Sequence, residues 1–483
     1  MKKYLQYIIL ATGLIFSLSS CDLDIDPTDA VSIETVFTNA SNAEKVLNGT
    51  WAYMMDTYFT YQNPGLLSLS LVSDAMGNDA AIQPGKYGYL AHYSFTNINA
   101  NNSTTGRGIW TISYKVIDNS NHLISKIDDV PGNQDLKNRI KGQAHALRGY
   151  MYLNLATWYA HAYEYDPQAL SVPIYTEPSG STTEGGARRT VEEVYQQAEN
   201  DLLSAYNELQ GYNRDAKHKI DRNVVAGILA RLYLQKNQWE DAIEFAEIAH
   251  SGYSWMSRDD YKEGFNDRSN AEWIWGHGQS PDQSVASYGF NFLDVSSDAS
   301  FYYSFMADPH FRDFFEEGDV RTELFEWDLT RYSGGLMYKK FLYRNDKTAD
   351  IVLMRKAEMV LIEAESLAEM GQLAESISLL NELRTARGAA TLNLSGLTQE
   401  ELVDEILIER RKELFGEGFG LYDLKRRQLP VQRTAASGLV PGTDITIKGH
   451  TVLRFPDMTE FTANSPYYLL AIPESEFTNN PNL

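Results

Sequence analysis

Carboxylates are abundant in this sequence, and adjacent pairs of them have the chemistry for hydrolysis. Glu316-Glu317 and Asp259-Asp260 carry the side chains that a glycoside hydrolase uses as its acid and its base. The chain contains 65 aspartates and glutamates, so adjacent acids are also expected on solvated faces without any catalytic role. We interpret these pairs as solvated surface. Of the functions considered for this chain, a surface glycoside hydrolase is therefore the one that we favour least.

Other signatures of catalysis or metal binding are missing from the sequence. It contains no His-Glu-x-x-His, no P-loop, no Gly-x-Ser-x-Gly and no dinucleotide fingerprint. The nine histidines show no metal-ligand spacing, and the single cysteine, Cys21, excludes a thiolate metal cluster. Loop carboxylates could bind a structural calcium ion, but no ligand set follows from the sequence. We therefore predict a protein that is not an enzyme and has no cofactor.

Aromatic side chains are in excess, with 30 tyrosines, 20 phenylalanines and 8 tryptophans. Many lie in two segments that lack helical periodicity: Tyr87, Tyr89, Tyr93 and Trp110 in the first, and Trp273, Trp275, Tyr288, Phe290, Phe292, Phe301, Tyr302 and Tyr303 in the second. Aromatic faces stack on the apolar C–H faces of sugar rings, and rings with a few polar groups among them form a normal ligand site. The alternative is that the rings pack long loops onto the core, which we favour for any single ring.

Helices must form the framework that holds these loops. In 140–160 the apolar residues recur every three or four positions. The segment 190–209 opens on Thr190 and has Glu193 three residues later, which is a capping-box pattern. A late helix is predicted over 398–415.

Two other segments share a repeating pattern of small and large residues. Residues 223–249 indicate two helices joined at Asn237-Gln238, with small and aromatic residues at the spacing of a tetratricopeptide unit, and 357–383 repeats that spacing. Small residues let paired helices approach closely, and Tyr233 would fill the gap between them. The pattern predicts an interrupted scaffold of helical repeats. The alternative is two ordinary helical hairpins.

Long stretches rich in Gly, Asn, Ser, Asp and aromatic residues separate these helices: 60–110, 162–189, 251–350 and 430–483. Irregular stretches of this length in a compact protein are usually functional. Within the third, Glu272-Trp273-Ile274-Trp275 predicts a short strand. No obvious linker divides the chain.

The N-terminus has the features of an export signal. A basic start, a short apolar run and small residues before Cys21 predict that residues 1–20 are a signal peptide, because the run is too short to span a membrane. Cys21 at the cut site resembles the lipobox of bacterial lipoproteins, which implies acylation of its thiol. Residues 21–30 then form an acidic tether. The alternative is an ordinary signal peptide with a chance cysteine nearby.

The charge of the chain limits its partners. The formal net charge of −23 becomes −25 when Lys2 and Lys3 leave with the signal peptide. A surface this acidic disfavours binding to nucleic acid and charge-driven adhesion to anionic lipids. Any membrane anchor must therefore be covalent. A neutral ligand is easier to reconcile with this charge than an anionic one.

Several segments together resemble the SusD/RagB family of nutrient-binding lipoproteins of Bacteroidota. They occur in the family's order and run almost to the C-terminus: Ala144–Leu153 followed by Val172-Pro173, Arg189–Tyr195, Ala230–Leu234, Arg355–Glu365, Glu409–Gly418 with Tyr422-Asp423-Leu424, and Ala471–Glu476. Any one segment is weak, but the ordered set is specific. Among them we interpret Glu409, Arg410, Arg411 and Glu413 as structural ion pairs that lock the last helix.

The resemblance implies a mostly α fold: a tetratricopeptide-like, right-handed superhelix of about four helix pairs, with a loop-rich lobe and a few short strands. It implies an N-terminal SusD-like part over 31–250 and a C-terminal RagB/SusD part with ligand loops over 251–483.

The resemblance also implies a role and a location. The expected protein is a cell-surface lipoprotein of the outer membrane that captures oligosaccharide and delivers it to a SusC-like TonB-dependent transporter. Some relatives are associated with peptide uptake, so a binder of peptide or another nutrient is the second alternative.

Ligand residues in this family come from divergent loops. The founding starch binder has an acidic dipeptide followed by tryptophans, and the tryptophans are missing here. The corresponding positions imply a set of ligand-binding residues in two loops: Asn78, Asp79, Tyr87 and Tyr89 in the first, and Tyr288, Phe301 and Tyr302 in the second.

Overall fold

The computed structural model describes residues 36–483 except for 59–63, 86–87, 282–288 and 394. Cys21, Tyr87 and Tyr288 therefore lie outside the described residues.

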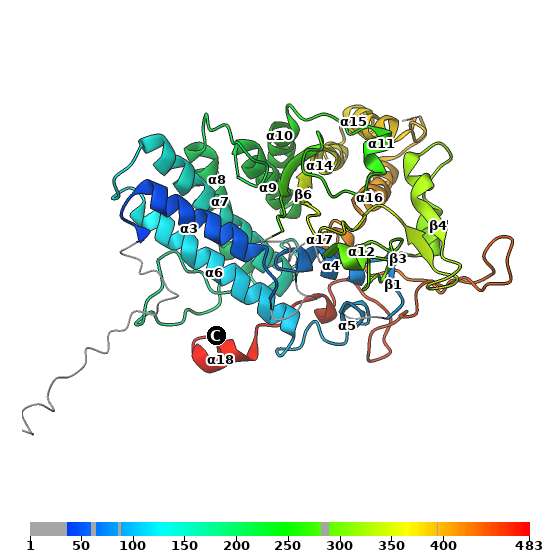
Figure 1. Cartoon of the computed structure of the whole chain (residues 1–483), viewed down its shortest axis with the longest axis horizontal. Helices are drawn as coiled ribbons and strands as arrows, with labels where there is room; N and C mark the ends of the chain where they lie inside the picture. Colours follow the sequence, from blue (N-terminus) through cyan, green and yellow to red (C-terminus); the bar gives the residue numbers. More distant parts are fainter. Residues whose placement is uncertain (1–35, 59–63, 86–87, 282–288, 394) are drawn as a thin grey trace, which may run out of the picture.

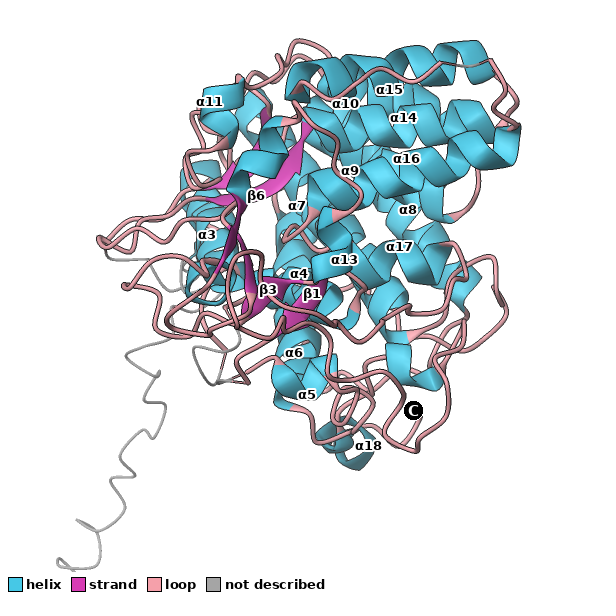
Figure 2. Ribbon diagram, turned by 90° about the vertical axis from the view of Figure 1, so that its right-hand side faces the viewer, coloured by secondary structure: helices cyan, strands magenta, loops and turns pink. Residues whose placement is uncertain are grey.

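The described chain is mostly helical, with a few short strands (Figure 1 and Figure 2). The longer helices are α3 (Ala40–Met54), α4 (Leu67–Met76), α6 (Thr104–Lys126), α7 (Gln134–Tyr159), α8 (Val191–Glu208), α9 (Arg222–Gln235), α10 (Trp239–His250), α14 (Lys356–Glu369), α15 (Leu373–Arg387) and α16 (Gln399–Leu414). The short ones are α5 (Leu90–Tyr93), α11 (Arg258–Tyr261), α12 (Phe290–Leu293), α13 (Pro309–Arg312), η3 (Val320–Leu324), α17 (Gly420–Arg426), η4 (Pro466–Tyr468) and α18 (Glu474–Asn479).

The long helices form the tetratricopeptide-like scaffold that the sequence predicts. Helix α7 packs against α6 and α8, α9 packs against α8 and α10, and α14 packs against α10, α15 and α16. The scaffold therefore continues across the long insertion between α10 and α14. Figure 1 shows elements of the insertion, such as α12, β3 and β4, at one end of the scaffold, while the C-terminal segment runs from there to α18, below α6.

The helices predicted from periodicity are confirmed. Helix α8 begins with the capping box of Thr190 and Glu193, and α9 and α10 meet at Asn237, whose φ is +52°. Tyr233 fills the gap between these two helices by stacking on Phe245, with ring centroids 5.5 Å apart. Helix α16 also begins with a capping box, in which Thr398 accepts a hydrogen bond from the backbone N–H of Glu401.

The prediction that 60–110 is irregular is wrong in part, because it contains α4 and the start of α6. Every residue of α4 except Ser70 is buried, so the helix has almost no polar face and its periodicity is weak. In α6, by contrast, Ile109, Ile112, Val116 and Leu123 are buried at helical spacing, a signal that could have indicated the helix.

The strands form two small antiparallel sheets. The larger sheet contains, in this order, β1 (Ala80–Ile82), β3 (Phe305–Ala307), β5 (Leu336–Tyr338) and β4 (Phe325–Trp327). The smaller sheet pairs β2 (Trp273–His277) with β6 (Ile351–Arg355). The strand predicted around Trp273 is therefore confirmed as β2. In the larger sheet Ala80 pairs with Ala307 and Ile82 with Phe305, which joins two segments more than 200 residues apart.

One hydrophobic core extends through most of the described molecule. It includes Ala40 in α3, Leu229 in α9 and Ile472 near the C-terminus. A smaller core cluster lies between α14, α15 and α16. Among the described helices, none combines the length and the apolar character that crossing a bilayer requires.

Candidate functional site

The two loops that the sequence predicts for ligand binding meet in space. The β1–β3 ladder aligns them, and the backbone N–H of Gln83 extends it by donating to the carbonyl oxygen of Ser304 at 2.8 Å. The side chains around this junction form a surface that we call the aromatic rim: Gln83, Phe301, Tyr302, Tyr332, Lys448 and Thr451.

Phe301 and Tyr302 form the aromatic part of the rim. Phe301 is 69% exposed, and its ring meets that of Tyr302 edge to face at 5.3 Å. Tyr302 in turn stacks on buried Phe292 at 5.8 Å and 22°. The loop is fixed by Asn291, whose side-chain oxygen accepts the N–H of Phe301 at 3.1 Å. The exposed ring of Phe301 thus lies against a half-buried ring that the core supports from below.

Polar groups gather around Gln83, whose backbone pairs with Ser304, two residues beyond Tyr302. Tyr332 donates its hydroxyl to Gln83 Oε1 at 2.8 Å, and Gln83 Nε2 donates to Thr451 Oγ1 at 2.8 Å. Lys448 holds its ammonium 4.0 Å from the centroid of the Tyr332 ring. Partial burial raises the pKa of Tyr332, so its hydroxyl is neutral at physiological pH and available as a donor. Neutral hydroxyl and amide groups beside aromatic faces suit a polyhydroxylated ligand.

Tyr89 does not lie at the surface where the sequence predicts it. The side chain is 1% exposed, and its ring packs edge to face against Phe292 at 5.0 Å and Phe305 at 5.4 Å. Burial raises the pKa of its hydroxyl well above the ordinary value. The predicted ligand contact of Tyr89 therefore conflicts with its burial: this ring supports the rim from beneath.

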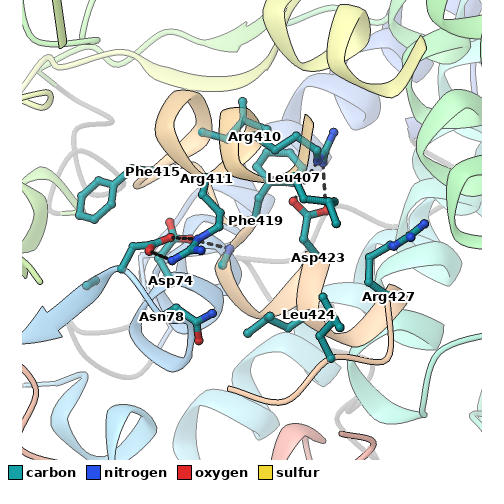
Figure 3. A pocket seen from close by; sticks show the side chains of 15 residues that line it. Asp74, Asn78, Leu407, Arg410, Arg411, Phe415, Phe419, Asp423, Leu424 and Arg427 are labelled. Carbon is teal, nitrogen blue, oxygen red and sulfur yellow. Dashed lines mark hydrogen bonds and ion pairs between the residues drawn. The ribbon is translucent and has the colours of Figure 1, made fainter. Parts of the chain in front are cut away.

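Asn78 and Asp79 line a separate pocket, between the α4–β1 turn and α16–α17 (Figure 3). Asp79 accepts two hydrogen bonds from Arg411, at 2.5 and 3.1 Å, and Asn78 Oδ1 accepts the backbone N–H of Gln432 at 2.8 Å. In the same pocket Arg410 forms a two-bond ion pair with Asp423. The polar atoms of Asp79 are thus occupied by the protein, and the structure does not bring it into the rim.

Burial also changes the protonation of Asp74 in this pocket. It raises the pKa of Asp74 to about 7, although the backbone N–H groups of Gly418 and Gly420 donate to the carboxylate at 2.9 Å and oppose the shift. These bonds attach α4 to the start of α17, where the backbones approach so closely that a Cβ on Gly77 would lie 2.9 Å from Gly420.

A buried ion-pair network lies near the same helices, formed by Glu272, Asp319, Arg321, Arg355, Arg384, Arg387, Glu409 and Glu413. At its centre Glu413 receives Arg321 at 2.9 Å, Arg355 at 2.5 Å and Arg387 at 2.7 Å. Burial alone would raise the pKa of Glu413, but the three guanidinium groups lower it well below its ordinary value.

The network and its surroundings confirm the interpretation of Glu409, Arg410, Arg411 and Glu413 as structural ion pairs.

Members of both acidic pairs considered for hydrolysis have structural partners. Glu316 forms ion pairs with Arg384 at 2.6 Å and Lys412 at 3.1 Å, and Asp260 completes a capping box with Ser257 at α11. Within the described residues, no group of three or more histidine, cysteine, aspartate or glutamate side chains is placed to hold a metal ion.

Comparison with known proteins identifies the fold's relatives. A family model described as "Starch-binding associating with outer membrane" matches residues 28–234, and the SusD family model matches 327–483. A solved structure from Bacteroides vulgatus, described as a SusD-like carbohydrate binding protein, is 42% identical, covers 92% of this chain and 98% of that chain, and has a TM-score of 0.88. The chain belongs to the SusD family.

Two other relatives extend this SusD-family comparison. SusD-like protein P2 of Formosa agariphila is 24% identical over 100% of this chain and 99% of its own length. A solved structure described as a laminarin-binding SusD-like protein is 21% identical, covers 81% of this chain and 92% of that chain, and has a TM-score of 0.65. At that identity the second likeness concerns the fold alone.

Proposed function

We propose that this SusD-family protein binds oligosaccharide at the aromatic rim and delivers it to a SusC-like TonB-dependent transporter. The observation that carries the proposal is the 69% exposed ring of Phe301, which is held beside Tyr302 on a buried aromatic support. The 42% identical relative described as carbohydrate binding supports the same ligand class.

The chemistry of the rim favours a neutral glycan. The rings offer apolar faces for the C–H groups of a sugar, while Gln83, Tyr332 and Thr451 can exchange their mutual hydrogen bonds for sugar hydroxyls. The chain carries a net charge of −23, which would repel an acidic polymer at long range. Lys448 is the one cation of the rim and lies over Tyr332.

Phe301→Ala tests the rim. Removing a central aromatic anchor is expected to weaken glycan binding by about 2 kcal/mol, roughly thirtyfold in Kd. Phe477→Ala is the matched control, because Phe477 is also exposed, at 49%, but lies on α18. Affinity electrophoresis finds the glycan in a panel, and calorimetry gives its Kd. Unchanged binding by Phe301→Ala would remove the rim from the proposal.

The same panel separates the alternatives. Binding without release of reducing sugar supports a protein that is not an enzyme, whereas release by clean protein would favour a glycoside hydrolase. If every glycan fails and oligopeptides bind, the protein captures peptide in the same transporter architecture.

Anchoring and delivery belong to the same proposal. Acylated Cys21 would tether the protein to the outer membrane beside its transporter, and the family model's association with the outer membrane supports that location. Cys21→Ala should release the protein from membranes. Retention of Cys21→Ala in cells that lack the transporter would argue against the lipid anchor, and failure to co-purify with the transporter would argue against delivery.

A further inference from the structure

A second cavity lies in the interior, away from the rim, where the helical scaffold meets α4 and α17. Helices α4, α7 and α9, strand β6 and the segment 417–422 surround it. Figure 1 shows α4 and α17 near the middle of the molecule, between the scaffold and the sheet β1-β3-β5-β4. None of the rim side chains lines this cavity.

Three polar side chains that line the cavity have buried atoms without a hydrogen-bond partner among the described residues. They are Nε2 of Gln235, Nδ2 of Asn154 and the hydroxyl oxygen of Tyr422. Gln235 is 5% exposed. Buried polar groups in folded proteins are almost always paired with protein, water or ligand. Three unpaired groups around one cavity therefore indicate that water or a polar ligand occupies it.

The other end of the Gln235 amide is held firmly. Its Oε1 accepts hydrogen bonds from Thr157 Oγ1 at 3.0 Å and from the Tyr195 hydroxyl at 2.8 Å. The free end is thus fixed at the cavity wall before any ligand arrives. A ligand hydroxyl can both donate and accept, so it suits an amide in either orientation as well as the Tyr422 phenol.

The charges around the cavity are already neutralised. Arg231 pairs with Glu358 at 2.6 Å, and Glu417 pairs with Arg355 at 2.7 Å and Lys340 at 2.5 Å. The unpaired groups that remain are neutral amides and a phenol, which favour a neutral ligand over an ion.

The rest of the wall is apolar and partly aromatic. Tyr150 and Trp158 of α7 are both buried, and they line the cavity with Phe419 and leucines of α4. Such faces suit the C–H groups of a sugar ring. We propose that this cavity is a second binding site, which takes a single sugar ring or another small neutral polyol.

Tyr422→Phe tests the site with a minimal change. The hydroxyl has no partner in the ligand-free protein, so its removal should leave the melting temperature unchanged or raise it. The mature protein is titrated by calorimetry with glucose, galactose, xylose and N-acetylglucosamine, and crystals are soaked in each. We expect one sugar to occupy the cavity and its affinity to fall about tenfold in Tyr422→Phe.

Two other variants make the result decisive. Asn154→Leu fills the cavity with an apolar side chain and should abolish binding of the same sugar. That sugar is also titrated against Phe301→Ala, because a loss there would assign it to the rim and overturn the cavity site. The inference also fails if the cavity holds only water in every soak, or if Tyr422→Phe binds the sugar as wild type does. Oligosaccharide binding at the rim is scored separately with the glycan panel, so failure of one site does not imply failure of the other.

Discussion

The ion-pair network around Glu413 and the aromatic rim around Phe301 both draw residues from the insertion between α10 and α14, yet they differ in exposure and in chemistry. Glu413, Arg321 and Arg355 are fully buried, and each charge has several partners. Phe301 is an apolar ring that the fold leaves largely in solvent. The network places charge where water cannot reach, and the rim places apolar surface where water can.

The difference distinguishes residues that hold the lobe together from residues that can meet a ligand. Breaking the network leaves an uncompensated buried charge, which is costly, so its members are constrained by folding. An exposed ring contributes little to folding, so its replacement should leave stability nearly unchanged. Variants in the two regions should therefore separate stability from affinity.

The largest expected effect is on the network. Glu413→Gln would leave Arg321, Arg355 and Arg387 without their shared anion, and we expect the free energy of unfolding to fall by about 3–5 kcal/mol. Urea denaturation at neutral pH measures it. The control is Glu326→Gln, which breaks an exposed pair with Lys339 and should cost at most about 1 kcal/mol. Equal losses in both variants would mean that burial does not distinguish the network.

Tyr89→Ala and Phe301→Ala compare two rings of the same surface. Tyr89 is buried under the rim, so its truncation should destabilise the protein by about 3–5 kcal/mol, by analogy with other buried aromatic rings. Phe301→Ala should change stability by about 0.5 kcal/mol or less and reduce glycan affinity instead. Thermal unfolding and calorimetry on the two variants measure both quantities. A folded Tyr89→Ala with normal stability would contradict its place in the core.

Acid should weaken the network in a defined pH range. The pKa of Glu413 is lower in the folded than in the unfolded protein, so its contribution is complete above the unfolded value of about 4.3 and is lost as pH falls below it. The stability advantage of wild type over Glu413→Gln should therefore shrink by up to about 1.4 kcal/mol per pH unit below that value. Comparing the two proteins cancels the titration of buried histidines. An advantage that stays constant down to pH 3 would contradict this account.

The smallest expected effect concerns salt. If the rim binds a neutral glycan through rings and hydroxyl groups, its Kd should be nearly the same at low and high ionic strength. Calorimetry in the two buffers measures this. A marked weakening in salt would indicate instead that Lys448 pairs with an acidic sugar, and Lys448→Met would then remove the dependence.

The parts of the fold that were predictable share a simple local pattern. Helix α8 is indicated by its capping box, and α9 with α10 by the spacing of small residues around Tyr233. Helix α4 was not predicted from the sequence. It is buried on nearly all sides, so it lacks the alternation of polar and apolar faces by which helical periodicity is recognised. The ordered family segments supplied the overall architecture, which no single helix could.

The candidate site was predictable only in part. The loop with Phe301 and Tyr302 stood out by its aromatic residues, but nothing local distinguishes exposed Phe301 from buried Tyr89. Gln83, Tyr332 and Lys448 were missed, because single polar residues in separate loops carry no pattern. Gln83 and Tyr332 meet through a hydrogen bond between residues 249 apart in the chain, and Lys448 meets Tyr332 through a ring contact across more than 100 residues.

The sequence by itself determined the helical scaffold, the aromatic excess and the structural character of the Glu409–Glu413 charges, because each depends on spacing or on the order of family segments. Only the tertiary structure decided which aromatic rings face solvent and which unpaired polar groups surround one cavity. Exposure and pairing depend on neighbours distant in the chain. The β1–β3 ladder brings the segment of exposed Phe301 next to the segment of buried Tyr89. Helices α7, α9 and α17 place Asn154, Gln235 and Tyr422 around a shared cavity.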